Sequence, residues 1–589
     1  MVFIKQFKLL ENLSKSMAIN IQEKSQELKD FVSQYDTKIF IGDLSTLLQM
    51  VAMQNIPENL IGLIAPQRQL FYLAGLHLTS LKDKNKEIKY QYTDEEWNYI
   101  KSLLIEIETG YEEAFYPKDG IQLDDISKEQ LIIGLVYHLN YFNQGELNYE
   151  EQIIERIKFY FKPYENEIKN HFGLNQNEFI SIYKFLDEMQ HEKLNSVFPI
   201  AGEPTWDDVN LEQFIEGIMD PDKRHLSLPP SYLRMSENMA DQGKKNRFSS
   251  VELNKEFDPN IVKAFTNALS IKRDETQFLY YTESNPYFNH PIFEVDENEF
   301  QSFSIKQIII AIYNQLLNFV TSENAITERF YKHRGLELEN KIVSLFKSIL
   351  GDNAQIYQSY YTEVNKEQDI LILYKGMALI IEAKASKKRE PRSNPDKAYG
   401  VIKKNFDKVI QKGYDQSYRV KKRFLKNEII TLYEDKALSK EITKINSKNY
   451  HSAFSIVVTL ERFGQIQTDL ERMLKVEEND EFPLSICIDD LEVFLLAFKK
   501  RGSKFNELFR YFDLREYLHG GLICGDELEI CGGILDRKIP DKTLKSNEII
   551  RTHPDFAQIF DDYYHKGLGF KNEINLERKT SGKFLTMFK

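Results

Sequence analysis

The chain has 589 residues, 42% of them hydrophobic and 28% charged, which is the composition of an ordinary globular protein with several domains. No apolar run approaches the length of about 18 residues that a membrane span needs, and the first residues lack the apolar core of a secretory signal. We therefore expect a cytoplasmic protein with no membrane partner. Its three cysteines fit neither a disulfide framework nor a zinc site, and we expect reduced thiols.

A net charge of −13 conceals a basic segment. Residues 371–450 contain 20 Lys and Arg against 9 Asp and Glu, a local net charge of +11. A basic segment within an acidic chain is a local electrostatic feature that suits a polyanionic partner. The overall charge therefore does not exclude nucleic acid.

The first half of the chain is predicted to be mainly helical. Residues 1–218 form a large helical region, because stretches such as "EEWNYIKSLLIEIETGYEEAF" and "NEFISIYKFLDEM" place apolar side chains at helical spacing. Residues 219–325 are predicted to connect this region to the second half of the chain. Within them, residues 219–258 lose periodicity and are interpreted as a linker or exposed loop.

The rest of the connecting region is predicted to hold a hairpin and a helix. The hairpin turns at Asp296-Glu297-Asn298. Ser304, with Gln307 three residues later, indicates a capping box that starts the helix.

From residue 326 the pattern changes to α/β. Residues 326–475 are predicted to form one domain, and residues 476–589 a small α/β C-terminal region. The elements expected in the former are a helix over 338–349, a strand over 354–363, a strand pair over 369–384, a helix over 397–425 and a strand over 453–460. In the C-terminal region, "LSICI" indicates a strand, and Asp489 or Asp490 is expected to cap the next helix.

The strand pair "QDILILYKGMALIIEAK" carries acids at its open end. If Lys375 and Gly376 are the two turn residues, Asp369 lies directly opposite Glu382, with Cβ atoms about 4.5–5.5 Å apart. A four-residue loop gives the same register. A three-residue loop would instead turn the two acids to opposite faces of the sheet.

Two facing acids destabilise a sheet unless a cation lies between them. Oxygen ligands suit Mg²⁺ or Mn²⁺, and strand alternation places Lys384 on the face of Glu382, where it can orient a water or stabilise charge on a phosphate. The alternative is a surface hairpin with ordinary charges at its rim. Glu339, beside the buried stripe of the preceding helix, is the third expected metal ligand; its alternative is a solvated glutamate at a helix start.

The helix over 397–425 has two faces. Its apolar residues form a packing side: Ile402, Phe406, Val409, Ile410, Val420 and Phe424. A basic stripe lies on another flank: Lys404, Lys408, Lys412, Arg419, Lys422 and Arg423. With Lys387 and Lys388 just upstream, these cations are expected to contact phosphates. Gln416 lies at the edge of the packing side, and Gln411 is expected to face water.

Together, Glu339, Asp369, Glu382-Ala383-Lys384 and the helix bearing Gln416 resemble the PD-(D/E)XK nuclease superfamily. The resemblance covers residues 326–475 and implies a restriction-endonuclease-like core of order αβββαβ. It implies that Asp369 and Glu382 bind Mg²⁺, with Glu339 at the position of the first acid, and that Lys384 positions the attacking water.

Two glutamines complete the comparison with this superfamily. Gln416 falls where many members carry a further motif residue. Gln368 is a departure, because it occupies the place of an often-present proline, which is not a ligand.

These observations predict a metal-dependent nuclease that cleaves DNA. An unregulated nuclease would harm its own cell, so the helical region is hypothesised to recognise a protein partner or trigger, as in antiphage or anti-plasmid defence. The alternatives are an RNA-cleaving nuclease, a non-catalytic nucleic-acid-binding adaptor that retains the fold, and a protein-interaction scaffold that docks through the basic helix.

Overall fold

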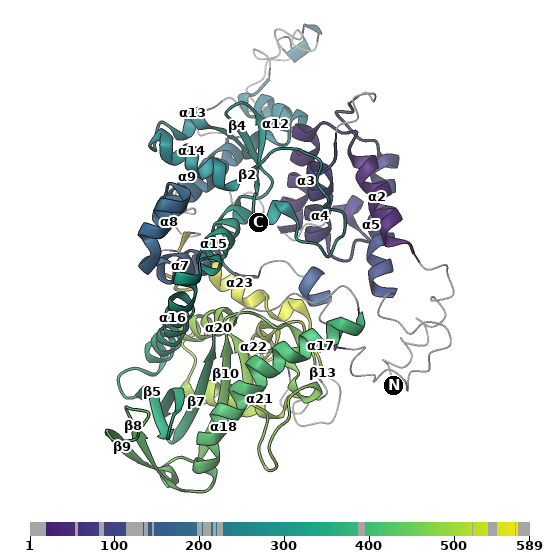
Figure 1. The fold of residues 1–589 in the computed structure, drawn as a ribbon. Coiled ribbons are helices and arrows are strands. Elements are labelled where there is room, and N and C mark those ends of the chain that lie inside the picture. Colours follow the sequence, from purple (N-terminus) through teal and green to yellow (C-terminus); the bar gives the residue numbers. More distant parts are fainter. Residues whose placement is uncertain are drawn as a thin grey trace. The chain divides into compact units, whose positions relative to one another are not determined.

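The structure is a computed structural model in which the chain divides into two compact units (Figure 1). It describes residues 19–52, 57–81, 88–113, 139–143, 147–196, 228–386, 395–520, 522–539 and 550–571, with a few isolated positions between these ranges. Among the described residues, the first unit contains those from 19 to 113 and from 147 to 323. The second unit runs from residue 324 to 576.

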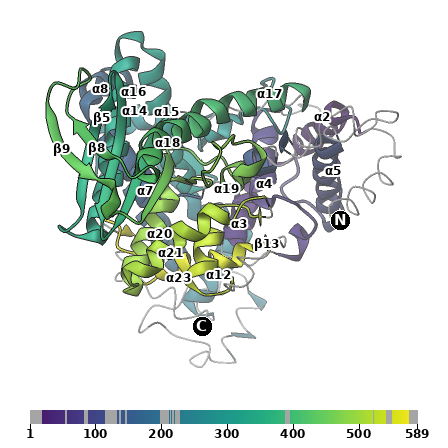
Figure 2. The ribbon, with the colours of Figure 1, turned by 90° about the horizontal axis from the view of Figure 1, so that it is seen from below.

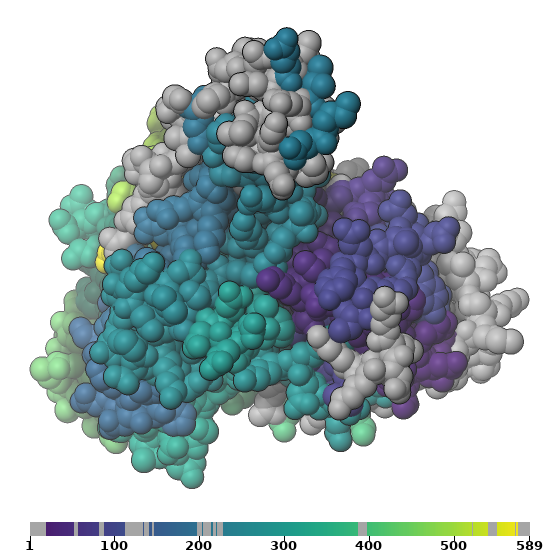
Figure 3. Space-filling view, turned by 90° about the horizontal axis from the view of Figure 1, so that it is seen from above, coloured from purple at the N-terminus to yellow at the C-terminus, as the bar shows by residue number. Residues whose placement is uncertain are grey.

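Helices dominate the first unit, as the periodicity predicts. They are α2 (Ile21–Val32), α3 (Thr37–Ala52), α4 (Pro66–Leu78), α5 (Asp94–Glu113), α7 (Glu150–Tyr160), α8 (Glu165–Phe172), α9 (Gln176–Asn195), α12 (Pro230–Ala240), α13 (Ser250–Leu253), α14 (Pro259–Leu269) and α15 (Ile305–Ser322). Helix α9 starts at a capping box in which the side chains of Asn175 and Glu178 accept from each other's backbone N–H groups. Figure 3 shows the purple surface of residues early in the sequence next to the blue and teal surface of later residues. The Arg273 guanidinium makes such a contact by donating to the carbonyl oxygen of Ser33 at 2.6 Å.

A four-stranded sheet completes this unit, in the order β1-β4-β3-β2. Its strands are β1 (Arg247–Ser249), β2 (Ser270–Ile271), β3 (Ile292–Asp296) and β4 (Glu299–Ser302). The predicted hairpin is confirmed, because β3 pairs antiparallel with β4 around Asn298, which has a left-handed φ of 65°. The predicted linker is wrong for residues 228–258, which form α12, β1 and α13. Residues 221–227 lie outside the described residues.

The predicted capping box at Ser304 does not form. Helix α15 begins at Ile305, directly after Ser304, but the Ser304 side chain makes no capping hydrogen bond. Gln307 instead donates from Nε2 to the carbonyl oxygen of Phe288 at 2.9 Å. The predicted helix start is therefore correct, while a tertiary contact uses the side chain that the box requires.

The second unit is mixed α/β. It opens with α16 (Asn324–Leu350), β5 (Gln355–Glu363), β6 (Lys366–Tyr374) and β7 (Met377–Lys384). One long helical stretch comes next, made of α17 (Pro395–Phe406), a π-helical turn (Asp407–Gln411) and α18 (Lys412–Leu425). After it come β8 (Ile429–Tyr433), β9 (Glu441–Asn446), β10 (Ser452–Thr459), β11 (Leu484–Cys487), α20 (Ile488–Arg501), α21 (Phe505–Tyr517), β12 (Leu522–Ile523), α22 (Glu527–Leu535), β13 (Ile550–Arg551) and α23 (Gln558–Tyr564).

Seven of these strands form one sheet in the order β11-β10-β7-β6-β5-β8-β9. Strands β7, β10 and β11 are parallel to one another, and the other neighbours pair antiparallel. The helices and strands α16, β5, β6, β7, α18 and β10 succeed one another in the predicted order αβββαβ, with the hairpin β8–β9 inserted before β10 and added at the β5 edge (Figure 2). This hairpin was not predicted from the sequence.

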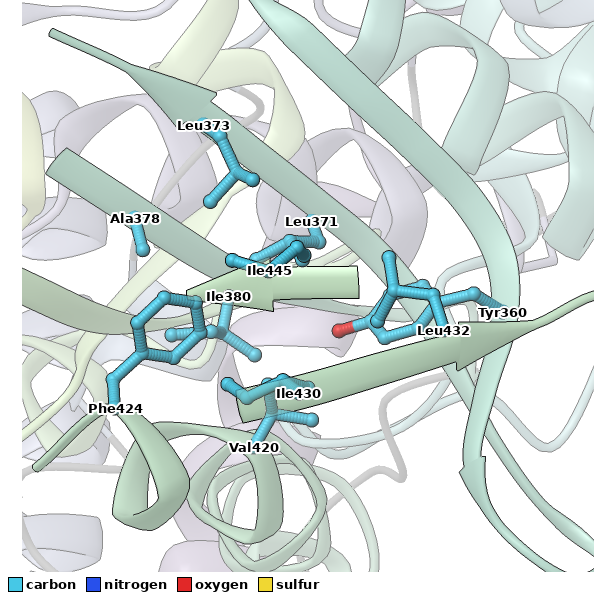
Figure 4. Packing of buried hydrophobic residues seen from close by; sticks show 10 residues of the cluster. All are labelled: Tyr360, Leu371, Leu373, Ala378, Ile380, Val420, Phe424, Ile430, Leu432 and Ile445. Carbon is cyan, nitrogen blue, oxygen red and sulfur yellow. The ribbon is translucent and has the colours of Figure 1, made fainter. Parts of the chain in front are cut away.

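Helix α18 packs on one face of the sheet. Its side chains Val420 and Phe424 join a buried cluster with residues of five strands (Figure 4): Tyr360, Leu371, Leu373, Ala378, Ile380, Ile430, Leu432 and Ile445. All six apolar residues of the predicted packing side are buried. Strand β7 is the most enclosed part, because Met377 to Ile381 are completely buried between β6 and β10.

The region after residue 475 is continuous with this sheet. Strand β11 pairs with β10, so the predicted boundary between 475 and 476 falls within one sheet. Helix α20 begins at Ile488 after Cys487, which places Asp489 and Asp490 inside its first turn and not at the predicted capping position. Asp490 accepts from the Arg462 guanidinium at 2.6 Å instead.

Two further expectations concern the state of the cysteines and the absence of a membrane span. The three cysteines are free and buried. Within the described ranges, no helix combines the length and the apolar character that crossing a membrane requires.

Candidate active site

The acids of the central hairpin lie where the sequence register places them. Tyr374 pairs with Met377 and Ile370 with Ile381, which confirms the predicted register. Asp369 and Glu382 are the next positions outward. Lys375 and Gly376 both have left-handed φ values, 46° and 78°, as a two-residue type I′ turn requires.

Lys384 joins the two acids on one side of the sheet. Its Nζ lies 2.9 Å from Glu382 Oε2 and 3.8 Å from Asp369 Oδ2. Asp369 Oδ2 also accepts from the backbone N–H of Ala383 at 2.7 Å. The Glu382 side chain is completely buried, whereas those of Asp369 and Lys384 are 19% and 13% exposed. The group therefore has one open side.

Helix α18 brings Gln416 to the same group. Lys384 Nζ donates to Gln416 Oε1 at 2.8 Å. This contact needs a close approach between helix and sheet, and Gly413 permits it. A Cβ atom at Gly413 would lie 2.8 Å from Val457 Cγ1 and 3.2 Å from Lys384 Cε. Gly413 was not predicted from the sequence, although a glycine inside a helical pattern indicates a close contact.

Glu339 approaches the acids from α16. Its Oε2 accepts from Gln358 Nε2 at 3.3 Å and from Ser359 Oγ at 3.4 Å. The pairs on either side place Ser359 across from Asp369, and Ser359 has a left-handed φ of 52° within β5. A non-glycine residue in this conformation is uncommon and occurs often at functional sites. Gln358 and Ser359 carry no sequence signal that would have identified them.

Burial and like charge shift the pKa values of the acids strongly. Burial, then the neighbouring Asp369 charge, raises the pKa of Glu382 from 4.5 to about 8. The same two causes raise the pKa of Glu339 from 4.5 to about 7. Asp369 is thus close enough to oppose ionisation of both glutamates, an effect that a bound cation would reverse.

Asp369 and Glu382 fit a divalent cation. Glu382 Oε1 is buried and receives no N–H donor from the described part of the chain, and the Asp369 carboxyl group lies at hydrogen-bonding distance from that of Glu382. Mg²⁺ commonly takes one or two carboxylates from protein and completes its shell with water and substrate phosphate. Among the described residues, no three His, Cys, Asp or Glu side chains converge as a ligand set. The geometry therefore brings together two of the predicted metal ligands and leaves Glu339, held by Gln358 and Ser359, in their surroundings.

The basic residues fall into three groups. Lys404, Lys408 and Lys412 are exposed, and no described carboxylate pairs with them. Arg419 is half-buried near Glu363, whereas Arg423 is paired with Glu428 at 3.0 Å, so that a phosphate would compete with this carboxylate for it. Gln411 does not simply face water, because it donates to Asp415 and to the carbonyl oxygen of Lys475.

The two remaining predicted phosphate contacts, Lys387 and Lys388, lie outside the described residues. Comparison with known proteins adds no relative, since no protein-family model, no curated protein and no solved structure matches this chain. The candidate site therefore rests on its own geometry.

We expect the stability of the metal-free protein to fall as pH rises. The folded protein holds the Glu382 proton more tightly than the unfolded chain, so this group's stabilisation is complete below pH 4.5 and is lost as pH rises toward 8. Melting temperatures in EDTA between pH 5.5 and 8.5 should decrease by about 3 °C or more, since 1 kcal/mol corresponds to about 2–4 °C at this size. In the Glu382→Gln variant the melting temperature should fall less between these pH values. If it falls equally in wild type and variant, Glu382 does not cause the pH dependence.

We expect Gly413→Ala to destabilise the second unit. The added methyl group meets Val457 and Lys384, and overpacking of this kind costs about 1–3 kcal/mol. Gly400→Ala is the matched control, because Gly400 lies in α17 with nothing within 4 Å of its added Cβ. The control should gain up to about 1 kcal/mol from helix propensity. Denaturant unfolding of the two variants measures the difference, and equal stabilities would show that Gly413 is not packed as described.

Proposed function

We propose that the second unit is a metal-dependent nuclease that hydrolyses phosphodiester bonds of DNA. The single observation that carries the proposal is the convergence of Asp369, Glu382 and Lys384 on one side of the sheet, where the two carboxyl groups lie against each other. Holding two carboxyl groups against each other, one of them fully buried, is costly unless a proton or a cation lies between them. A binding site for a cation explains the cost, and a purely structural hairpin does not.

The order of elements supports the same proposal. The PD-(D/E)XK resemblance expects αβββαβ, with acids on the second and third strands and a lysine two residues after the second acid. In this chain those strands are β6 and β7. The inserted hairpin β8–β9 extends the sheet at the edge away from β7 and β10. It therefore leaves the arrangement of Asp369, Glu382 and Lys384 unaffected.

Each side chain has a role in this proposal. Mg²⁺ or Mn²⁺, held by Asp369 and Glu382, would supply a Lewis acid for the scissile phosphate and for a bound water. Lys384, fixed by Glu382 and Gln416, orients the attacking water and stabilises the negative charge that grows on the phosphate as the P–O bond breaks. Gln416 positions Lys384. Asp369 opposes the ionisation of Glu339, and a bound cation would reverse this effect, so that Glu339 would then add negative charge beside the cation.

The exposed lysines of the long helix complete the proposed substrate surface. Lys404, Lys408 and Lys412 succeed one another at intervals of four residues, which places them along one side of the helix. Contacts with phosphates position a nucleic acid but carry no base information. We therefore propose little sequence preference from this surface. Recognition of a partner or trigger by the first unit, in antiphage or anti-plasmid defence, stays a prediction.

The first test is cleavage itself. Wild type, Asp369→Ala and Lys384→Ala are incubated with duplex DNA, single-stranded DNA and RNA, each with Mg²⁺ or EDTA. We expect cleavage of DNA with Mg²⁺ only and a loss of at least about 100-fold in both variants, because each removes a group that acts in the transition state.

Asp352→Ala is the control, since Asp352 is 96% exposed in the turn after α16. Equal residual cleavage in all proteins would indicate a contaminant. If the protein binds nucleic acid without cleaving it, and neither Mg²⁺ nor Asp369→Ala changes this binding, the non-catalytic adaptor is favoured. If the protein cleaves RNA but not DNA, RNA is the substrate. If it shows no salt-sensitive binding of any nucleic acid, the protein-interaction scaffold is favoured.

The second test concerns the lysines. The triple variant Lys404→Gln, Lys408→Gln and Lys412→Gln should bind duplex DNA more weakly, and the slope of log K against log salt should fall by about 2–3, at about 0.9 for each phosphate lost. Fluorescence anisotropy at several salt concentrations measures both quantities. The control triple Lys448→Gln, Lys499→Gln and Lys500→Gln removes the same charge from exposed positions elsewhere. If the salt slope is the same in both triple variants, Lys404, Lys408 and Lys412 affect binding only through the overall charge of the protein.

A further inference from the structure

Arg334 is a buried cation beside the candidate site. It lies in α16, is 3% exposed, and donates from a terminal guanidinium nitrogen to the carbonyl oxygen of Ala385. Ala385 directly follows Lys384 at the end of β7. The guanidinium therefore sits one residue beyond the lysine that contacts both acids.

The guanidinium has far fewer partners than its burial requires. Its Nε is buried without a hydrogen-bond acceptor, and no described carboxylate pairs with it. Two other arginines of this unit are satisfied: the buried Arg515 bonds to Glu527, Leu518 and Thr468, and the partly buried Arg462 bonds to Asp490. A buried charge without a counter-ion is destabilising. Arg334 is thus the one of these three arginines that lacks an anion among the described residues.

Its orientation is fixed by aromatic rings. The guanidinium carbon lies 5.4 Å from the ring centre of Phe330 and 5.0 Å from that of Tyr331. Such cation–π contacts hold the guanidinium in place without using its N–H donors. A guanidinium held in this way is suited to an anion such as a phosphate that reaches its remaining N–H donors.

We propose that Arg334 binds the phosphate next to the one that is cleaved, an inference that rests on the proposed nuclease function. Ala385, whose carbonyl oxygen Arg334 contacts, is three residues after Glu382, and at about 3.3 Å for each strand residue it lies within about 10 Å of that acid. A DNA strand that presents one phosphate to Asp369 and Glu382 then carries a neighbouring phosphate toward Arg334. The external phosphate would supply the counter-ion that the described part of the fold does not provide.

Binding tests this proposal separately from cleavage. Full-length protein carrying Asp369→Ala is titrated onto a short fluorescein-labelled DNA duplex at several salt concentrations, with and without Arg334→Gln. We expect Arg334→Gln to weaken binding about 10-fold and to lower the salt slope by about 1, as the loss of one phosphate contact predicts. Lys332→Gln removes the same charge from an exposed position two residues away, on the opposite side of α16, and should change the affinity less than about 2-fold because exposed charges are screened by salt.

A second measurement separates phosphate binding from support of the Ala385 carbonyl group. Neutral methylphosphonates replace the phosphates one at a time. One replacement should weaken binding of the protein with Arg334 intact and leave the Arg334→Gln protein unaffected. A lower melting temperature with an unchanged salt slope, or no binding of the duplex, would overturn the proposal. If the salt slope falls as expected but wild type cleaves no DNA, Arg334 remains a phosphate contact and only the nuclease function fails.

Discussion

The site depends on a hairpin register that forces two carboxyl groups to the same side of one sheet. The turn at Lys375 and Gly376 sets this register, since both residues adopt left-handed φ values. Gly376 is needed for a second reason, because a Cβ there would lie 2.6 Å from the His451 ring. A slip of one residue would move an acid to the other face. The turn thus fixes the spacing between Asp369 and Glu382 from a distance.

The enclosure of β7 makes this arrangement stable enough to persist. Its first five residues are fully buried, so packing along the strand holds Glu382 at a position that its own ionisation opposes. The ammonium group of Lys384 offsets part of the repulsion, and Gln416 holds that ammonium group in place. Strong packing next to unfavourable electrostatics is typical of sites in which a fold is organised in advance for a ligand.

Local patterns predicted much of this fold, and contacts distant in sequence account for the features they missed. The register of β6 and β7 and the buried side of the long helix follow from turn chemistry and periodicity, and both were correct. The capping box at Ser304 failed because Phe288 competes for Gln307. The boundary after 475 failed because β11 finds its partner in β10, which no local pattern of either strand reveals. The left-handed Ser359 and the close approach at Gly413 likewise depend on neighbours that only the folded chain brings near.

The number of internal anions around a buried cation distinguishes a structural charge from one that is available to a ligand. Lys421 lies 2.7 Å from Asp480 and 2.9 Å from Glu516, so its charge is neutralised inside the fold. Lys384 has a partner in Glu382 but remains at the open side of the acids, where a substrate can compete for it. Arg334 is held, among the described residues, by a carbonyl oxygen and two aromatic rings. A buried cation that is less well compensated by an internal anion has a greater need for an anion from outside. This need increases from Lys421 through Lys384 to Arg334, and the last two lie at the end of β7 or contact the residue that follows it.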